Sequence, residues 1–334
     1  MSAQAFQPPA WLRNAHIQSV LASSGLRGRF ARGRFPQFSS QAQPHLLDCG
    51  SGVRLLGFHS EPVNHDGPSR GLVVLIHGWE GCAESSYMLA IGGRLQAAGY
   101  GVFRLQLRDH GDTHHLNEEL FHSCRLDEVV GAVAAIAQQF PQRPMLIGGF
   151  SLGGNFALRV ANQAQAAGLP LVGAVAVCPP VDPQHTLEAI ERAPFIYEWY
   201  FVRKWTRSLK RKQALYPHRY AFEDWLRRPT LRDLTDRLVQ HYTDFGQLEN
   251  YLRGYSIAGD RLAGLPIPTT IVAAADDPVI PVTDFHQLQL GGQTELLLTQ
   301  HGGHCGYIQG RRLESWMEEL ILDRVERYAA AARQ

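Results

Sequence analysis

The sequence predicts an α/β protein, in which a mostly parallel, doubly wound sheet carries an inserted helical segment. From residue 71 onward, short apolar runs alternate with longer runs of helical periodicity. Between about residues 181 and 259 this alternation stops, and aromatic and basic residues at helical spacing take over. Strand–helix alternation favours parallel strands joined by right-handed crossovers. We therefore expect a core over 1–180 and 260–334, with an N-terminal extension over 1–45, and a helical cap over 181–259.

The expected strands are short apolar runs rich in β-branched residues, as is typical of strands buried on both faces of a parallel sheet. Helices are expected between them over 85–100 and 125–140, the first ending at Gly99, a frequent helix-terminating residue. A further helix is expected to start at Ser151. The expected strands cover 71–78, 101–107, 144–150, 171–180, 268–278 and 294–304.

Composition and charge exclude several classes of function. The 32 Lys and Arg residues balance the 31 Asp and Glu residues, so no overall positive field favours nucleic acid. The five cysteines are scattered and show no C-x-x-C spacing, which argues against a disulfide framework or a zinc site and favours a reducing compartment. No secretory signal and no apolar stretch near the ~20 residues of a membrane span is present. We expect a cytoplasmic protein without a cofactor, and its oligomeric state is left open.

A basic segment lies near the N-terminus. Residues 25–34, GLRGRFARGR, hold four arginines without a strongly apolar helical face. We expect a solvated loop here. Peripheral contact of these arginines with phospholipid headgroups is the alternative.

Ser151 is the candidate nucleophile. Residues 149–153, GFSLG, match the G-x-S-x-G pattern and lie between an expected strand and an expected helix, the context this motif requires. A serine held in so sharp a turn needs small neighbours where the helix and the strand approach each other. The alternative is a serine that only caps the helix. In the first interpretation, the backbone N–H of Leu152 at the helix start would bind an oxyanion.

An acid and a base are expected at the ends of later strands, where catalytic groups of open α/β sheets gather. Asp277 follows the strand at 268–278, and Asp276 is the runner-up because adjacent residues of an extended chain point to opposite sides. His304 follows the last strand beyond two glycines, and His301 is the alternative. Histidine, with a pKa near ~6.5, would take the serine proton, and Asp277 would fix its tautomer.

The segment HGWEG, residues 77–81, follows an earlier strand and offers a second oxyanion donor. We expect this donor to be the backbone N–H of Trp79, with His77 and Gly78 shaping the loop. The chain order Ser151, Asp277, His304 is that of one of the known serine triads.

A histidine-rich segment, residues 108–123, contains metal-ligand residue types but lacks the H-E-x-x-H spacing. It follows an expected strand, so we expect a polar loop that borders the site. No metal site is expected.

The chain resembles the α/β-hydrolase superfamily, in particular its YheT-like branch, which includes lipid-acting α/β-hydrolase-domain proteins. The resemblance rests on PPAWLRNAHIQSVL (8–21), HGWEG (77–81), GFSLGGN (149–155), ADDPVIP (275–281) and HGGHCGY (301–307). It implies a serine-dependent ester hydrolase with Ser151, Asp277 and His304 as its triad. Trp79 departs from the smaller aliphatic residue common in the family, which puts the width of the acyl pocket in question.

The expected function is therefore hydrolysis of a small-molecule carboxylic ester through an acyl-enzyme. The aromatic-rich cap favours an apolar acyl chain of short to medium length or a lipid-like ester. The alternatives are a thioesterase, an acyltransferase or a peptidase that uses the same triad, and a non-catalytic binding protein of this fold.

Overall fold

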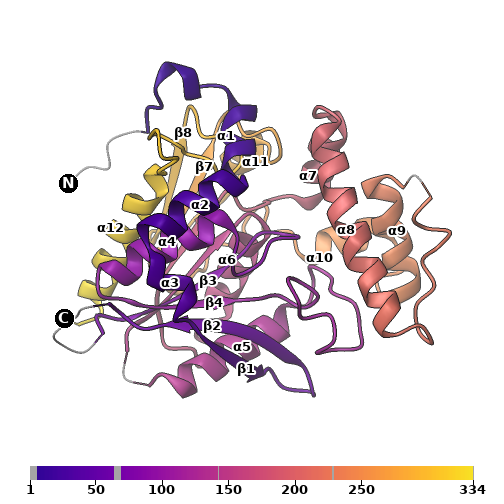
Figure 1. Cartoon of the computed structure of the whole chain (residues 1–334), viewed down its shortest axis with the longest axis horizontal. Helices are drawn as coiled ribbons and strands as arrows, with labels where there is room; N and C mark the ends of the chain where they lie inside the picture. The colour runs from indigo at the N-terminus through magenta and orange to yellow at the C-terminus, as the bar shows by residue number, and fades with distance from the viewer. Residues whose placement is uncertain (1–5, 64–68, 142, 228, 334) are drawn as a thin grey trace.

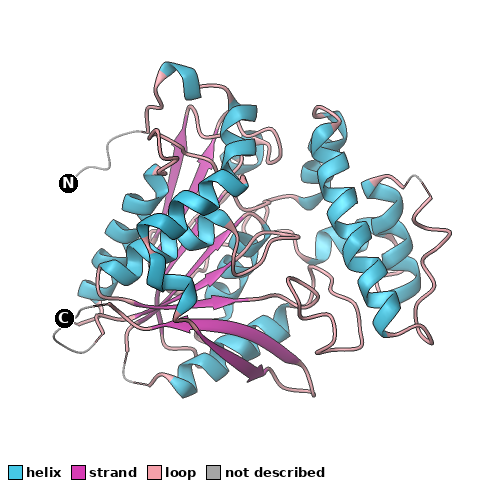
Figure 2. Ribbon diagram, viewed as in Figure 1, coloured by secondary structure: helices cyan, strands magenta, loops and turns pink. Residues whose placement is uncertain are grey.

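An eight-stranded sheet forms the centre of the molecule (Figures 1 and 2). The structure is a computed structural model that describes residues 6–63, 69–141, 143–227 and 229–333, so residues 1–5 of the expected N-terminal extension lie outside the described residues. The strand order is β1-β2-β4-β3-β5-β6-β7-β8, and the strands from β4 to β8 are parallel. The strands are β1 (Gln43–Asp48), β2 (Arg54–Ser60), β3 (Leu72–Ile76), β4 (Gly101–Leu105), β5 (Met145–Phe150), β6 (Leu171–Val177), β7 (Thr269–Ala274) and β8 (Thr294–Thr299).

Helices cover both faces of this sheet. Alternate residues of a strand point to opposite faces. In β3, Val74 belongs to the same buried cluster as Phe156 of α6, whereas its neighbour Val73 belongs to the cluster that contains Leu89 of α4. The helices α4 (Ser86–Ala97) and α12 (Trp316–Ala331) therefore cover one face, and α5 (Leu126–Gln139) and α6 (Leu152–Gln163) cover the other. The predicted α/β class with a mostly parallel sheet is confirmed.

The sheet also holds an antiparallel pair that the sequence pattern did not indicate. β1 pairs with β2, and β2 pairs with β4, both in the antiparallel sense. β1 lies at the edge of the sheet and only Leu47 in it is buried, so it lacks the continuous apolar run of the central strands.

The N-terminal segment is helical, and the expectation of a solvated loop over residues 25–34 is wrong. This segment is α2 (Gly25–Arg34), and Ser24 caps it by accepting the Arg27 N–H at 3.2 Å. Arg27 is 1% exposed, and its guanidinium donates to the carbonyl of Ala22. Packing of α2 against α4 offsets the low helix propensity of its glycines. The segment also contains η1 (Ala10–Leu12), α1 (Ala15–Ala22) and α3 (Pro36–Ser40).

Between β6 and β7 the chain forms helices that stand at the right of the view in Figure 1. A short helix, α11 (Val282–His286), follows β7. No helix in the described part of the chain is long and apolar enough to cross a membrane. The helices between β6 and β7 are α7 (Pro183–Arg192), α8 (Ile196–Leu215), α9 (Leu231–Tyr242) and α10 (Leu248–Gly254).

A buried lysine fastens α8 to the loop that follows β4. The Lys212 side chain is fully buried, and its ammonium lies 2.7 Å from a carboxylate oxygen of Asp109. The other oxygen of Asp109 accepts the Phe121 N–H. Burying a charge is costly unless it is paired and hydrogen-bonded, and Lys212 meets both conditions. Its ammonium also donates to the carbonyls of His114, Asn117 and Glu119.

Replacing Lys212 by methionine is expected to lower the free energy of unfolding by about 3–5 kcal/mol, because the carboxylate of Asp109 then stays buried without its cation. Urea unfolding followed by circular dichroism measures this loss. Arg211→Met is the matched control, since the neighbouring ion pair of Arg211 with Asp112 is exposed and worth less than about 1 kcal/mol. Equal losses in the two variants would contradict the anchoring role.

Candidate active site

Ser151 lies in a strained turn at the carboxyl end of β5, in the middle of the sheet. Its φ of 52° and ψ of −123° fall in a region that residues with a side chain rarely adopt. The turn is held because the Ser151 N–H donates to the carbonyl of Val177 at 2.8 Å, in the neighbouring strand. A side chain at Gly149 would overlap the backbone of Gly153, and one at Gly153 would overlap the backbone at Ile76. These glycines are therefore required for α6 to start where it does.

Ser151, His304 and Asp277 form a hydrogen-bonded chain. The Ser151 hydroxyl lies 2.9 Å from Nε2 of His304, and Nδ1 of His304 lies 2.9 Å from Oδ2 of Asp277. The other oxygen of Asp277 accepts the N–H groups of Val279 and Ile280 at 2.8 and 3.0 Å. The carboxylate is thus fixed on one side by the backbone and directed at the imidazole on the other. The structure brings together the three side chains that the sequence singled out.

Asp276 and His301, the runners-up, form a separate pair. Nδ1 of His301 lies 3.4 Å from Oδ2 of Asp276, and the other Asp276 oxygen accepts the Gly303 N–H at 2.9 Å. Adjacent carboxylates thus point to different partners, as expected for an extended backbone. Asp276 supports the loop that carries His304, whereas Asp277 contacts the imidazole itself.

The environment of His304 favours its protonated form. Burial alone would lower the pKa of His304, but the charge of Asp277 and the hydrogen bond to it outweigh this effect, and the pKa is raised above its ordinary value. The imidazole is therefore a stronger base than in water, while its second nitrogen faces the Ser151 hydroxyl. This is the arrangement that activates a serine hydroxyl for attack.

Two backbone N–H groups are free at the expected oxyanion site. Among the described residues, no protein acceptor takes the N–H of Trp79 or of Leu152. A side chain at Gly78 would approach Ser151, so this loop runs close to the nucleophile. His77 shapes the loop: its Nε2 accepts the Leu107 N–H, which leaves Nδ1–H to donate to the carbonyl of Gly78 at 2.8 Å. Burial lowers the pKa of His77 to about 4, so this neutral tautomer persists.

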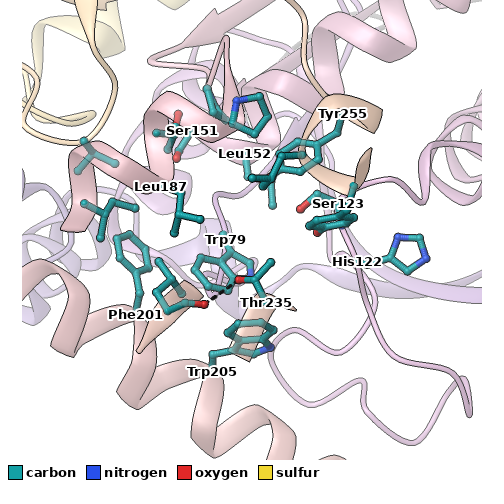
Figure 3. Close-up of a pocket in the computed structure, with 18 of the residues that line it drawn as sticks. Trp79, His122, Ser123, Ser151, Leu152, Leu187, Phe201, Trp205, Thr235 and Tyr255 are labelled. Carbon is teal, nitrogen blue, oxygen red and sulfur yellow. Dashed lines mark hydrogen bonds between the residues drawn. The ribbon is translucent and has the colours of Figure 1, made fainter. Parts of the chain in front are cut away.

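Ser151 opens onto two hollows, separated by the rings of Trp79 and Phe201, which stack at 5.4 Å. The first, here called the cap chamber, extends under the helices between β6 and β7, and Figure 3 shows Trp205 and Thr235 on its side away from Ser151. The cap chamber is almost entirely apolar, and its lining includes Leu152, Leu187, Ile190, Trp205, Leu238 and Leu252.

The second hollow, here called the α1–α8 pocket, lies between these two helices and is richer in hydroxyl groups. His304 and Lys204 line it. The ammonium of Lys204 donates to the carbonyl of Glu80 at 2.9 Å. The hydroxyl side chains of its lining are Ser19, Ser23, Ser24, Ser85, Ser86, Tyr87, Tyr197 and Tyr200.

The N-terminal helix α1 holds the loop that carries His304, a role the sequence reasoning missed. The hydroxyl of Ser19 accepts the His304 N–H at 2.8 Å. Gln18 is fully buried, and its amide bonds both the N–H and the carbonyl of Ile308. The signal was present in WLRNAHIQSV, where two adjacent polar residues, Gln18 and Ser19, stand within the first helix. Buried polar side chains require such partners.

The histidine-rich loop borders the site, as expected, through one end only. His122 and Ser123 line the cap chamber, and burial lowers the pKa of His122 to about 3, so its ring stays neutral. The rest of the loop binds α8: Nε2 of His114 lies 2.8 Å from the hydroxyl of Ser208.

In the described chain, the ligand-type side chains that come within 4.8 Å of one another are Cys178, His304 and Cys305. Both nitrogens of His304 are already bonded to Ser151 and Asp277. Burial also raises the pKa of Cys178 well above its ordinary value, which disfavours the thiolate that a metal would need. The chemistry of these groups therefore suits a protein-only serine site.

Comparison with known proteins gives consistent matches. The family model described as "Serine aminopeptidase, S33" matches residues 67–304. The putative esterase YheT of Escherichia coli (strain K12) is 27% identical over 342 residues, covering 99% of this chain and 95% of that protein. Monoacylglycerol lipase ABHD2 of Mus musculus is 24% identical over 215 residues, covering 56% of this chain and 49% of that protein. The solved structure of the Pyrococcus furiosus esterase Pf2001 superposes with a TM-score of 0.56 at 16% identity, covering 86% of this chain and 91% of that one.

Asp277→Asn is expected to lower kcat by about 10³–10⁴-fold, because the amide no longer stabilises the imidazolium or fixes its tautomer. Asp276→Asn, the matched control, is expected to lower kcat by less than about tenfold, because it affects only a hydrogen bond of the loop. Initial rates with a p-nitrophenyl ester measure both. Losses of similar size would contradict the assignment of Asp277.

The pH dependence of kcat/KM tests the same pair. The neutral form of His304 is the base, so activity is expected to fall as the pH drops through its raised pKa, at a pH above the ordinary ~6.5. In Asp277→Asn this acidic limb is expected to move to lower pH, because both interactions that raise the pKa are weakened. A limb that stays in place would show that another group titrates.

Proposed function

Because this chain belongs to the α/β-hydrolase family whose model is described as "Serine aminopeptidase, S33", within its YheT-like branch, we propose that it hydrolyses carboxylic esters through an acyl-enzyme on Ser151. Esterases and lipases are among its relatives and structural neighbours. The observation that carries the proposal is the hydrogen-bonded chain from Asp277 through His304 to Ser151, at the mouth of an apolar chamber.

In the proposed reaction, the Ser151 oxygen attacks the acyl carbon while Nε2 of His304 takes the hydroxyl proton. The N–H groups of Trp79 and Leu152 stabilise the oxyanion of the tetrahedral intermediate. The carbon–oxygen bond to the alcohol then breaks, and the imidazolium gives its proton to the leaving alcohol. Water, deprotonated by His304, attacks the acyl-enzyme in the same way and releases the acid.

The two hollows support an assignment of the two halves of the substrate. We assign the acyl chain to the cap chamber, because its lining removes apolar surface from water. The alcohol half then lies in the α1–α8 pocket, where hydroxyl groups and the ammonium of Lys204 suit a polar leaving group. We also propose that residues 181–259 act as a cap on a core formed by 1–180 and 260–334.

The linings favour an ester over a peptide with a free amino terminus. An aminopeptidase must bind an ammonium group close to the nucleophile, and a carboxylate is the natural partner for it. Within the described residues, neither hollow is lined by Asp or Glu, and Lys204 would repel a cation. The proposal therefore does not extend the activity in the family model's description to this chain.

A fluorophosphonate probe is expected to label the protein at Ser151 and to leave Ser151→Ala unlabelled. The same variant is expected to lose at least about 10⁴-fold in kcat on p-nitrophenyl esters, since the nucleophile is absent. Mass spectrometry of the labelled peptide and initial rates measure the two effects, with a chelator present to separate metal chemistry. Full activity in Ser151→Ala would overturn the proposal.

Filling the cap chamber is expected to change acyl-chain preference. Thr235→Phe should shorten the space available and reduce kcat/KM for long acyl chains by about fourfold per excluded methylene, with little effect on acetate. Gln240→Phe adds the same ring to the exposed side of α9 and is the matched control. A series of p-nitrophenyl esters of increasing acyl length gives the two profiles. Identical profiles would place the acyl chain outside this chamber.

A further inference from the structure

Large apolar side chains are exposed around the opening of the α1–α8 pocket. In the described part of the chain, exposed large apolar residues occur at few positions, and most of these lie within residues 11–26 and 195–199. Phe195 is 82% exposed, and the others in this group lie between 44% and 56%. Those at the opening, here called the apolar rim, are Ile17, Val20, Phe195, Ile196 and Trp199.

The apolar rim is one surface made of two segments. Nδ1 of His16 in α1 lies 2.8 Å from the hydroxyl of Tyr197 in α8, so the two helices meet at this point. Figure 1 shows α1 and the turn between α7 and α8 at the same end of the molecule. Val20, Ile196 and Trp199 also line the α1–α8 pocket, which reaches Ser151 and His304. The rim is thus continuous with the route to the nucleophile.

Unpaired cations continue the rim along α8. Residues 196, 199, 203, 207 and 210 follow one another at intervals of three or four and therefore share one face of the helix. This exposed face begins with Ile196 and Trp199 and continues with Arg203, Arg207 and Lys210. None of these three cations forms an ion pair with any described residue. The one acid near the start of α8, Glu198, turns inward and accepts the Leu231 N–H.

We propose that the apolar rim docks on an anionic lipid surface and that the ester reaches Ser151 from that surface through the α1–α8 pocket. Aromatic and aliphatic side chains would enter the boundary of the lipid layer, while the arginines meet the acidic headgroups. The occupant is an anionic lipid surface, because a row of unpaired cations flanks the apolar side chains. The docking stands apart from the chemistry, whereas delivery of the ester rests on the proposed function.

Docking is tested on the full chain carrying Ser151→Ala, so that vesicles are bound without being hydrolysed. This protein is expected to sediment with vesicles of phosphatidylcholine mixed with phosphatidylglycerol, and far less with phosphatidylcholine alone. Ile17→Ser combined with Phe195→Ser, which line neither hollow, is expected to weaken this partition at least about tenfold. Leu46→Ser combined with Leu215→Ser changes equally exposed leucines away from the rim and is expected to leave the partition unchanged.

The cations are tested separately. Arg203→Gln combined with Arg207→Gln is expected to reduce binding to the anionic vesicles and to make the remaining binding less sensitive to salt. Absence of vesicle binding, or equal loss in the rim variant and in the leucine control, would overturn the proposal. A dimer in solution that the rim variant dissociates would also overturn it, because the rim would then be an interface between copies of the chain.

Delivery is tested with Ser151 intact. On a short ester dissolved as monomers, Ile17→Ser combined with Phe195→Ser is expected to keep the original kcat/KM, and on a long-chain ester held in anionic vesicles it is expected to lose about tenfold. Equal loss on both substrates would contradict delivery from the surface. Failure of the fluorophosphonate probe to label Ser151 would remove the proposed function, while the binding result with Ser151→Ala would still stand.

Discussion

The close approach of α6 to the central strands, at the turn that holds Ser151, is the constraint on which the rest of the site depends. The turn combines a positive φ at Ser151 with the absence of side chains at Gly149 and Gly153. It directs the first N–H groups of α6 toward the space in front of Ser151, where they are most effective on a developing negative charge. Because β5 lies between β3 and β6, the loops after these neighbouring strands lie at the same edge of the sheet. The other site residues need only short connections to reach Ser151.

The same helix start also fixes the helices between β6 and β7. The Asn155 side chain, fully buried one turn after Ser151, donates to the carbonyls of Pro180 and Tyr255 at 3.0 and 2.9 Å. These carbonyls lie close to the points where the chain leaves and rejoins the sheet. At its other end this segment is held by the ion pair of Lys212 with Asp109. With a polar anchor at each end, the cap chamber is formed in advance of binding, which lowers the entropic cost of ordering a substrate.

The sequence was sufficient where local pattern and chemistry coincide. Continuous apolar runs located the central strands, and the G-x-S-x-G turn with later Asp and His residues located Ser151, Asp277 and His304. It was insufficient where the deciding partner is distant. Lys212 stands in a basic run that resembles a solvated helix face, and its partner lies 103 residues away. Arg27 likewise belongs to a segment that resembles a loop, yet it is buried by contacts with other elements. Periodicity contains no information on such pairs.

The dual role of α1 places a mechanical condition on any event at the apolar rim. Ser19, on one side of this helix, holds the backbone of His304, while Ile17 and Val20 are exposed at the rim. A displacement of α1 would therefore move the imidazole away from Ser151. Gln18 opposes such a displacement, because its amide makes buried hydrogen bonds to Leu12 and Ile308. Each of these bonds would lose its partner if the helix shifted, at a cost of about 1–3 kcal/mol for each group left unsatisfied. The rim is thus a fixed platform, and a surface that binds it can orient the substrate without disturbing the base.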